Sequence, residues 1–211
     1  MTTQIAKTVA EGLLKINAVK LQPNKPFTWA SGWYSPIYCD NRKTLAFPEL
    51  RNKIRDGFVE IIQKSLGDFD VIAGVATGAI AHGAFVADKM NKPFCYVRSS
   101  PKGHGLENLI EGHVKAGQKV IVIEDLISTG GSSLKAVEVL RNEGCEVVAL
   151  LAIFSYDFDV ANKSFDLYNC KLITLSNYET MIQTALELDY IQASDIEILQ
   201  QWRANPASWN K

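Results

Sequence analysis

The residues with the clearest chemical potential are the acidic pair Glu124 and Asp125, which follow the apolar run VIVI and precede the segment LISTGGSS. Backbone N–H groups and hydroxyls in a loop that leads into a helix form an anion site that suits a phosphate. Carboxylates in direct contact would repel a phosphate. The pair therefore suits the hydroxyls of a neighbouring sugar, or a cationic centre that develops during a reaction. The whole string indicates a site for a ribose-phosphate.

A structural interpretation of the same segment is simpler. The acids would stabilise the loop, and Ser132 or Ser133 would cap the helix that follows. An isolated acidic pair favours this interpretation, but the complete order of apolar strand, acids, hydroxyls, two glycines and helix start favours ligand binding. The segment contains neither G-x-x-x-x-G-K-[ST] nor G-x-G-x-x-G, so it is not one of the two common nucleotide-binding loops.

The hydrophobic pattern predicts the scaffold that must position these groups. Apolar residues at helical spacing, Ile5, Val9, Leu13, Ile16 and Val19, predict a first amphipathic helix. Short apolar runs then alternate with helical patterns, which is typical of a parallel sheet with helices on both faces. The fold class is therefore α/β with a doubly wound parallel sheet, whose ligands bind at the carboxyl ends of the strands. The predicted strands are 71–75, 93–97, 119–125, 146–154 and 171–175, and the predicted helices are 48–66, one that ends near 89, 132–143, 179–187 and 194–203.

The segment from 99 to 118 shows no clear periodicity over about 20 residues. A loop of that length within a compact domain is usually functional or mobile. It contains Lys102 and His104, and Arg98 stands just before it. The alternative is a solvated excursion without a role.

Composition narrows the class of protein without identifying it. The 211 residues carry 22 basic and 23 acidic side chains, so no overall charge attracts nucleic acid or a membrane surface. No apolar window is long enough to span a membrane. The four cysteines are widely spaced and form no C-x-x-C pair, which favours reduced thiols in the cytoplasm. We expect a single domain with no nucleic-acid or membrane partner.

Four segments carry a resemblance to a known family. VIVIEDLISTGGSS resembles the phosphoribosyl pyrophosphate (PRPP) motif of the type I phosphoribosyltransferases. FTWASGWYSPIYCDNR (27–42) resembles the hood segment of the orotate phosphoribosyltransferases, CYVRSSPKGHG (95–105) resembles their catalytic loop, and GVATGAIAHG (74–83) extends the similarity. The chain is identified as a member of that family.

The resemblance implies that orotate displaces pyrophosphate from PRPP and forms orotidine 5'-monophosphate, a step of UMP biosynthesis. An oxocarbenium-like transition state needs positioning and electrostatics more than a nucleophilic side chain. Lys102, His104 and Asp125 are then the expected catalytic residues, and Ser128 is expected to contact orotate. The expected PRPP-binding residues are Arg98, Lys102, His104, Glu124, Asp125, Leu126, Ile127, Ser128, Thr129, Gly130, Gly131 and Ser132.

The resemblance also implies an organisation. We expect the type I phosphoribosyltransferase fold, with a core over about 48–175, a small hood from about 1–45 plus the C-terminal helices, and a mobile catalytic loop over about 99–118, all within one domain, 1–211. Magnesium is the expected cofactor, held mainly through substrate rather than by dedicated protein ligands. A homodimer is expected, in which each loop reaches the partner's active site.

Two other functions remain open. A phosphoribosyltransferase for a purine or another base would share the acidic loop, and a non-catalytic relative could keep the fold to sense PRPP. The hood and loop segments favour orotate, and the balanced charge argues against a nucleic-acid-binding regulator. Gly78 and Ser99 stand where some relatives carry lysine, so pyrophosphate binding is expected to depend on Arg98, Lys102 and His104. The hood aromatics Trp29, Trp33, Tyr34 and Tyr38 either cover a planar base or fill the core.

Overall fold

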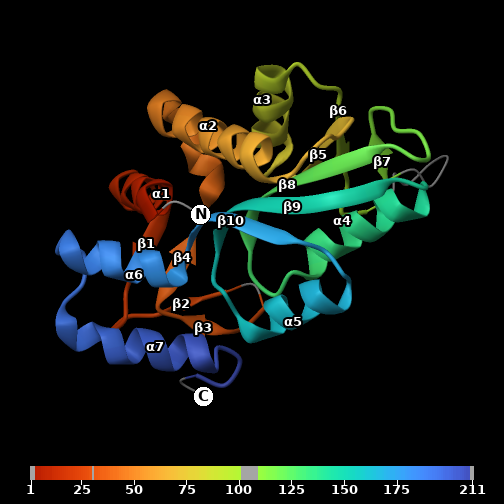
Figure 1. Ribbon diagram of the computed structural model, residues 1–211. Coiled ribbons are helices and arrows are strands. Elements are labelled where there is room, and N and C mark those ends of the chain that lie inside the picture. The colour runs from red at the N-terminus through yellow and green to blue at the C-terminus, as the bar shows by residue number, and fades with distance from the viewer. Residues whose placement is uncertain (1–2, 30, 101–108, 210–211) are drawn as a thin grey trace.

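The computed structural model describes residues 3–29, 31–100 and 109–209. In this part of the chain the central sheet has six strands in the order β10-β9-β8-β5-β6-β7 (Figure 1). Neighbouring strands are parallel except at one edge, where β7 pairs antiparallel with β6. The strands are β5 (Val71–Val75), β6 (Phe94–Val97), β7 (Ile110–Glu111), β8 (Lys119–Ile127), β9 (Glu146–Ser155) and β10 (Leu172–Asn177).

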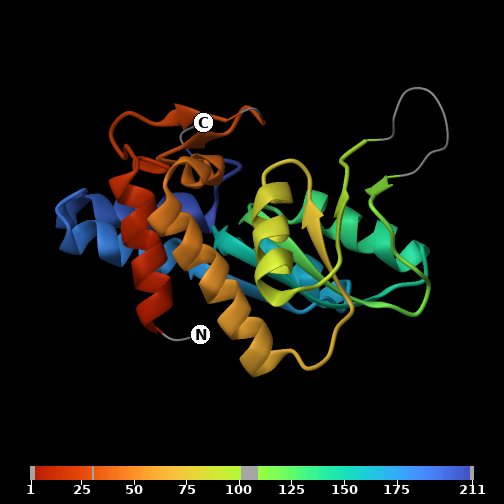
Figure 2. The same cartoon turned by 90° about the horizontal axis from the view of Figure 1, so that it is seen from above.

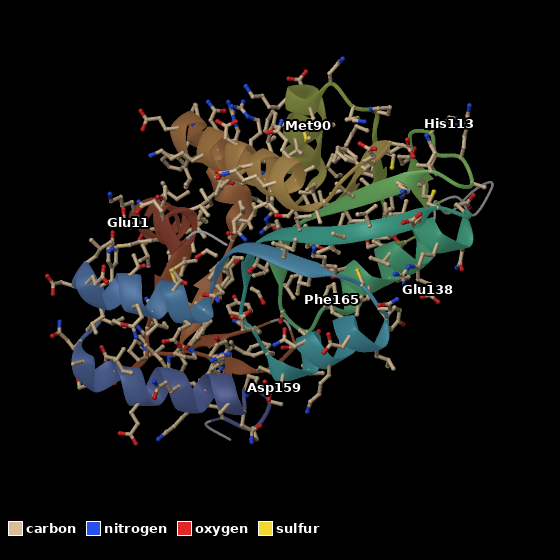
Figure 3. All side chains as sticks on the ribbon, in the orientation of Figure 1. Glu11, Met90, His113, Glu138, Asp159 and Phe165 are labelled. Atoms are coloured by element: carbon tan, nitrogen blue, oxygen red, sulfur yellow. The ribbon has the colours of Figure 1, made fainter. Side chains whose placement is uncertain are left out.

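Helices cover both faces of this sheet, as the alternating pattern predicted (Figures 1 and 3). Successive side chains of a strand point to opposite faces. Ile121 and Ile123 of β8 therefore join the hydrophobic core on the side of α2 and α3, whereas Val120 and Val122 join the core on the side of α4 and α5. Burial on both faces explains why the strands are apolar almost throughout. The helices are α2 (Pro48–Ser65), α3 (Ile80–Met90), α4 (Gly131–Asn142) and α5 (Asp159–Leu167).

A smaller layer lies beside the sheet and is formed by segments near both ends of the chain (Figures 1 and 2). Two short antiparallel pairs, β1 with β4 and β2 with β3, contribute its strands. Helix α1 packs against both α6 and β10, which attaches this layer to the sheet edge. Its elements are α1 (Thr3–Lys15), β1 (Val19–Leu21), β2 (Phe27–Thr28), β3 (Tyr34–Ser35), β4 (Ile37–Cys39), the 3-10 helix η1 (Asn41–Ala46), α6 (Tyr178–Glu187), η2 (Ala193–Asp195) and α7 (Ile196–Ala204).

The first helix is shorter than its apolar spacing predicted. It ends at Lys15, and Asn17 adopts a left-handed conformation with φ 54°, which stops a helix. Val19, expected on the helical stripe, instead pairs with Cys39 in the sheet formed by β1 and β4. A buried apolar residue is expected at this position in a helix and in a strand, so the apolar spacing alone did not distinguish the two.

The strand with the acidic pair is longer than predicted. β8 continues past Asp125 because Leu126 and Ile127 pair with Phe154 and Ser155 of β9. The acids therefore lie within the last part of a strand, where hydrogen bonds to β9 hold their backbone. Helix α5 had no predicted counterpart, and the segment 99–118, expected to lack regular structure, contains the short strand β7.

Candidate active site

A pocket of about 410 Å³ lies at the carboxyl ends of β5 and β8, where ligands bind in sheets of this class. Three segments form it: the end of β4 with the residues that follow, the turn after β5, and the acidic end of β8 with the start of α4. Its lining residues are Cys39, Asp40, Arg42, Val75, Ala76, Thr77, Gly78, Glu124, Asp125, Leu126 and Ser132. We call it the acidic pocket.

The two acids of this pocket have different environments. Glu124 is buried, and its two carboxylate oxygens accept hydrogen bonds from the Asp125 N–H (2.9 Å) and the Ser133 hydroxyl (2.7 Å). Burial, and then the neighbouring Asp125 charge, raise the pKa of Glu124 well above its usual range. Burial also raises the pKa of Asp125, and Arg42 acts in the opposite direction. Glu124 thus supports the loop, whereas the half-buried Asp125 is the acid more open to the pocket.

Gly78 lies directly against the Asp125 carboxylate. A Cβ atom at position 78 would overlap the carboxyl carbon and both of its oxygens. The glycine is therefore what allows the acid to take this position. Neither Gly78 nor the adjacent Ala76 and Thr77 was among the predicted site residues.

The N-terminus of α4 opens toward the acidic pocket without a side-chain cap. Gly130 precedes the helix with φ 83°, and a Cβ there would meet the Phe165 ring at 2.9 Å. As a glycine, this N-cap residue makes no side-chain cap hydrogen bond, and the Ser133 hydroxyl donates to Glu124. The alternative in which Ser132 or Ser133 caps the helix is therefore wrong, because Gly130 is the N-cap residue. N–H groups at the start of a helix suit a phosphate, and this site stays a prediction.

A second pocket of about 400 Å³ adjoins the first. Cys39 and Leu126 line both, so the two share a wall. Its other lining residues are Thr28, Trp29, Tyr38, Ser128 and Tyr156. Three aromatic rings with the hydroxyls of Thr28 and Ser128 beside an acidic pocket suit a planar, polar heterocycle. We call it the aromatic pocket.

A chain of buried polar groups connects η1 to the acidic end of β8. The Asn41 side-chain amide donates to the Asp125 main-chain oxygen at 2.6 Å, and the Thr44 hydroxyl donates to the Asn41 oxygen at 2.5 Å. His82 of α3 places Nε2 3.0 Å from the same hydroxyl. Because the hydroxyl hydrogen is directed at Asn41, Nε2 is the donor, and Nδ1 is left without a partner. Asn41 was not among the predicted site residues.

The remaining predicted residues lie at several places. Arg98 follows β6 and forms an ion pair with Glu111 of β7 at 3.4 Å, outside the lining of either pocket. Lys102 and His104 lie outside the described residues. Of the predicted loop residues, Ile127 is buried, and Thr129, Gly130 and Gly131 follow it at the start of α4 without lining either pocket.

Sequence reasoning missed the contribution of the residues after β4. Cys39, Asp40 and Arg42 line the acidic pocket, and an ion pair between Arg42 and Asp40 at 2.6 Å lowers the pKa of that acid. The available signal was the string CDNR directly after a strand. The string was recognised as part of the hood, but its residues were not assigned to the site.

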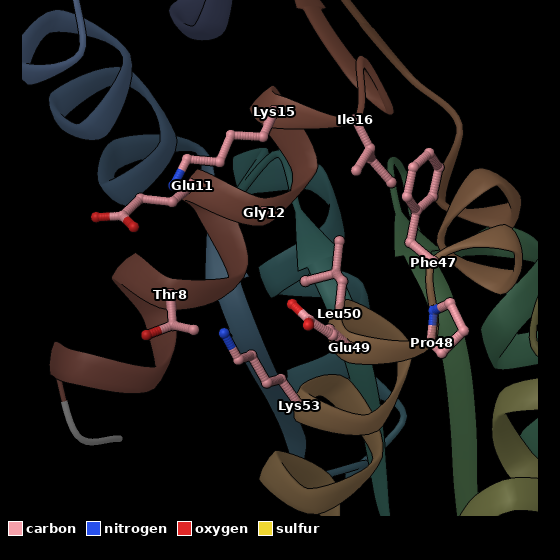
Figure 4. A pocket seen from close by; sticks show the side chains of 10 residues that line it. All are labelled: Thr8, Glu11, Gly12, Lys15, Ile16, Phe47, Pro48, Glu49, Leu50 and Lys53. Carbon is pink, nitrogen blue, oxygen red and sulfur yellow. The ribbon is translucent and has the colours of Figure 1, made fainter.

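Another groove, of about 420 Å³, lies between α1 and the start of α2 (Figure 4). Leu50 fills its centre and packs against Gly12, and Phe47 and Pro48 form one side. None of the predicted site residues lines this groove, and Pro48 at the start of α2 has no N–H to offer an anion. This groove therefore contributes none of the predicted chemistry.

Among the described residues, no three His, Cys, Asp or Glu side chains gather as a metal site. The acidic pocket nevertheless offers carboxylate oxygens from Asp40 and Asp125, and such hard donors fit magnesium shared with substrate oxygens. Of the helices in the same described part of the chain, none is long and apolar enough to cross a membrane.

Known proteins of one family match this chain over nearly its whole length. The family model of the phosphoribosyl transferase domain matches residues 44–188. An orotate phosphoribosyltransferase from Phocaeicola vulgatus is 57% identical over 205 residues, 97% of either chain. One from Porphyromonas gingivalis is 54% identical over 97% of this chain and 98% of its own. The crystal structure of orotate phosphoribosyltransferase from Aeropyrum pernix superposes with a TM-score of 0.75 at 28% identity, and covers 87% of this chain and 99% of its own.

Proposed function

This chain belongs to the orotate phosphoribosyltransferase family, and we propose that its two adjoining pockets hold the two substrates of that reaction. The enzyme transfers ribose 5-phosphate from PRPP to orotate and releases orotidine 5'-monophosphate and pyrophosphate. The wall that the two pockets share is the observation that supports assigning one pocket to each substrate. Because Cys39 and Leu126 line both, a sugar in the acidic pocket meets a planar base in the aromatic one.

The acidic pocket receives the ribose 5-phosphate half of PRPP. The open first turn of α4 and the loop over 128–132 bind the 5-phosphate through N–H groups and hydroxyls. Asp125 accepts hydrogen bonds from the ribose hydroxyls, and its charge stabilises the positive ribose ring of the transition state. Glu124 holds the Asp125 N–H and Ser133 in place behind it.

The leaving pyrophosphate is bound by Arg98, Lys102 and His104. Phosphate oxygens favour Arg forks and Lys point charges, and these cations offset the charge that grows on the leaving group. In the structure Arg98 forms an ion pair with Glu111, so on binding pyrophosphate Arg98 would exchange this carboxylate for a phosphate group. Closure of the loop over the substrates would exclude water from a hydrolysable intermediate.

Orotate occupies the aromatic pocket. The ring centroids of Trp29 and Tyr156 lie 5.2 Å apart at one side of the pocket. The side chain of Tyr38 is exposed and lies at the entrance. The Ser128 hydroxyl is placed to bond the polar edge of the base. In the proposed arrangement the base nitrogen faces the acidic pocket, as an in-line displacement at the anomeric carbon requires.

Magnesium is the proposed cofactor. Asp125 and Asp40 are the residues that would hold it, together with oxygens of PRPP. When bound it neutralises charge on the pyrophosphate and so favours its departure. The chain's own contribution is to orient the ribose and to keep the anionic leaving group beside cations.

The working unit is proposed to be a cytoplasmic homodimer, with the loop after β6 reaching the partner's site. The support is the family membership, together with Arg98 at the start of this loop and outside the lining of both pockets. Size-exclusion chromatography with light scattering measures the oligomer. A strict monomer with full activity would exclude the shared loop.

The test of the function is a base-specificity assay. Purified protein with magnesium and PRPP should consume orotate, seen as loss of its ultraviolet absorbance, while adenine, guanine and uracil are consumed far more slowly. Turnover of a purine in place of orotate would identify the other type of phosphoribosyltransferase. Binding of PRPP with no turnover of any base would indicate the non-catalytic alternative.

A further inference from the structure

Helix α7 lies outside the part of the chain that the family model matches, yet one of its side chains reaches the wall of the aromatic pocket. Trp202 is completely buried. Its ring meets Trp29 and Tyr156 edge to face, with centroids 5.7 Å apart in both cases. Trp29 and Tyr156 line the pocket, whereas Trp202 does not. Trp202 is therefore a second layer behind two of the three pocket aromatics.

Hydrogen bonds fix the position of this second layer. The Trp202 indole N–H donates to the main-chain oxygen of Tyr34 at 3.1 Å, which ties α7 to strand β3. The Trp29 indole donates to the Ile37 oxygen at 3.1 Å on β4. The Tyr178 hydroxyl donates to the Leu199 oxygen at 2.9 Å and holds α7 from the side of α6. The Trp202 ring thus has one orientation, and the pocket rings pack against it.

We propose that Trp202 is a positioning residue for the base: it sets the planes of Trp29 and Tyr156 and thereby the affinity and selectivity of the aromatic pocket. The proposal rests on the assignment of that pocket to orotate. Offset and edge-to-face arrangements depend on ring orientation, so a rotated Trp29 or Tyr156 would lose contact with a flat ligand. The acidic pocket shares none of these rings, so binding of PRPP does not depend on Trp202.

Simple core packing makes a different prediction. A large buried ring that only stabilises the fold would, when altered, lower the melting temperature and reduce the active fraction, which lowers the apparent kcat and leaves both Michaelis constants unchanged. A positioning residue changes the Michaelis constant for one substrate only. The ratio of the two Michaelis constants therefore separates the two roles.

The experiment compares Trp202→Phe with Trp209→Phe. Trp209 lies on the same C-terminal segment and packs partly buried against the core, with no ring contact to the pocket aromatics in the described structure. Trp202→Phe keeps an aromatic ring but removes the indole donor. We expect its KM for orotate to rise about five- to tenfold, the factor that one hydrogen bond gives when its effect falls on one substrate. KM for PRPP and kcat should change less than twofold, as should every constant of Trp209→Phe.

Two further variants keep the result decisive. Tyr178→Phe removes only the hydroxyl that holds α7, and should raise KM for orotate two- to threefold if Trp202→Phe is too unstable to assay. Tyr38→Ala alters the pocket itself and tests its assignment. Trp202 has no positioning role, and the pocket assignment stands, if Tyr38→Ala raises KM for orotate while Trp202→Phe and Tyr178→Phe do not. The same conclusion follows if Trp202→Phe shifts both Michaelis constants equally. If none of the variants moves KM for orotate in an active enzyme, the base binds elsewhere and both proposals are wrong.

Discussion

The side-chain amide of Asn41 donates a 2.6 Å hydrogen bond to the main-chain oxygen of Asp125, 84 positions later in the chain. Asn41 is buried at the start of η1, directly after the strand that lines both pockets. The bond joins the smaller layer of the molecule to the acidic end of β8. It holds the peptide plane from which the Asp125 carboxylate projects.

Asn41→Ala should reduce kcat/KM for PRPP about tenfold, because the loss of one hydrogen bond to this buried oxygen frees the Asp125 backbone. Steady-state kinetics with varied PRPP measures the effect. The control is Asn142→Ala, since Asn142 is exposed at the end of α4. Equal kinetics in the two variants would mean that the position of Asp125 is held by β8 alone.

Gly78→Ala should displace the Asp125 carboxylate, because the added Cβ would overlap it. A side chain that can rotate away limits the effect on stability, so we expect a change in melting temperature of only a few degrees. The effect on catalysis should be larger, with kcat/KM reduced by roughly 10- to 100-fold through misplacement of a catalytic group. Asp125→Asn in the same background tests the origin of the loss. If the acid has already been displaced, the second change should add little.

Lys102→Ala should lower kcat by orders of magnitude while the melting temperature is unchanged. The lysine lies outside the described residues, and its proposed partner is the pyrophosphate, whose negative charge grows in the transition state. A pre-steady-state measurement of product formation would separate chemistry from release. Lys115→Ala, an exposed lysine in the described residues of the predicted loop segment, provides the control. Wild-type kcat in Lys102→Ala would exclude the loop from the mechanism.

His82 should make stability depend on pH below neutrality. Burial, and then the charge of Arg51, lower the pKa of His82 from 6.5 to about 4. The folded state therefore disfavours the protonated imidazole, and the stability present above pH 6.5 is lost as the pH falls toward 4. The interval corresponds to about 3 kcal/mol. Urea denaturation at pH values across this interval measures the loss of unfolding free energy. His82→Gln retains a donor for Thr44, and its free energy of unfolding should fall by about 3 kcal/mol less than that of the wild type over the same interval. Parallel curves for the two proteins would show that His82 does not titrate in this way.

Much of the fold could be predicted from the sequence, because the helical spacing of apolar residues and the short apolar runs of buried strands were both clear. The buried strands of the sheet and the helices that cover them have local signals, and the glycine before α4 marks a conformation that few other residues adopt. The string from Glu124 to Ser132 predicted a ribose-phosphate site and indicated the family for the same reason: its residues are adjacent in the chain. Contiguous motifs need no knowledge of tertiary contacts.

The tertiary structure decided which residues share a pocket and which role each acid takes. Gly78 and Asp125, like Asn41 and Asp125, are separated by tens of residues, and no local pattern relates them. The two acids are adjacent in the sequence, and only the family resemblance distinguished Asp125 as catalytic. Only folding placed Glu124 against Ser133 and Asp125 beside the glycine, because the alternation of β8 sends neighbouring side chains to opposite faces.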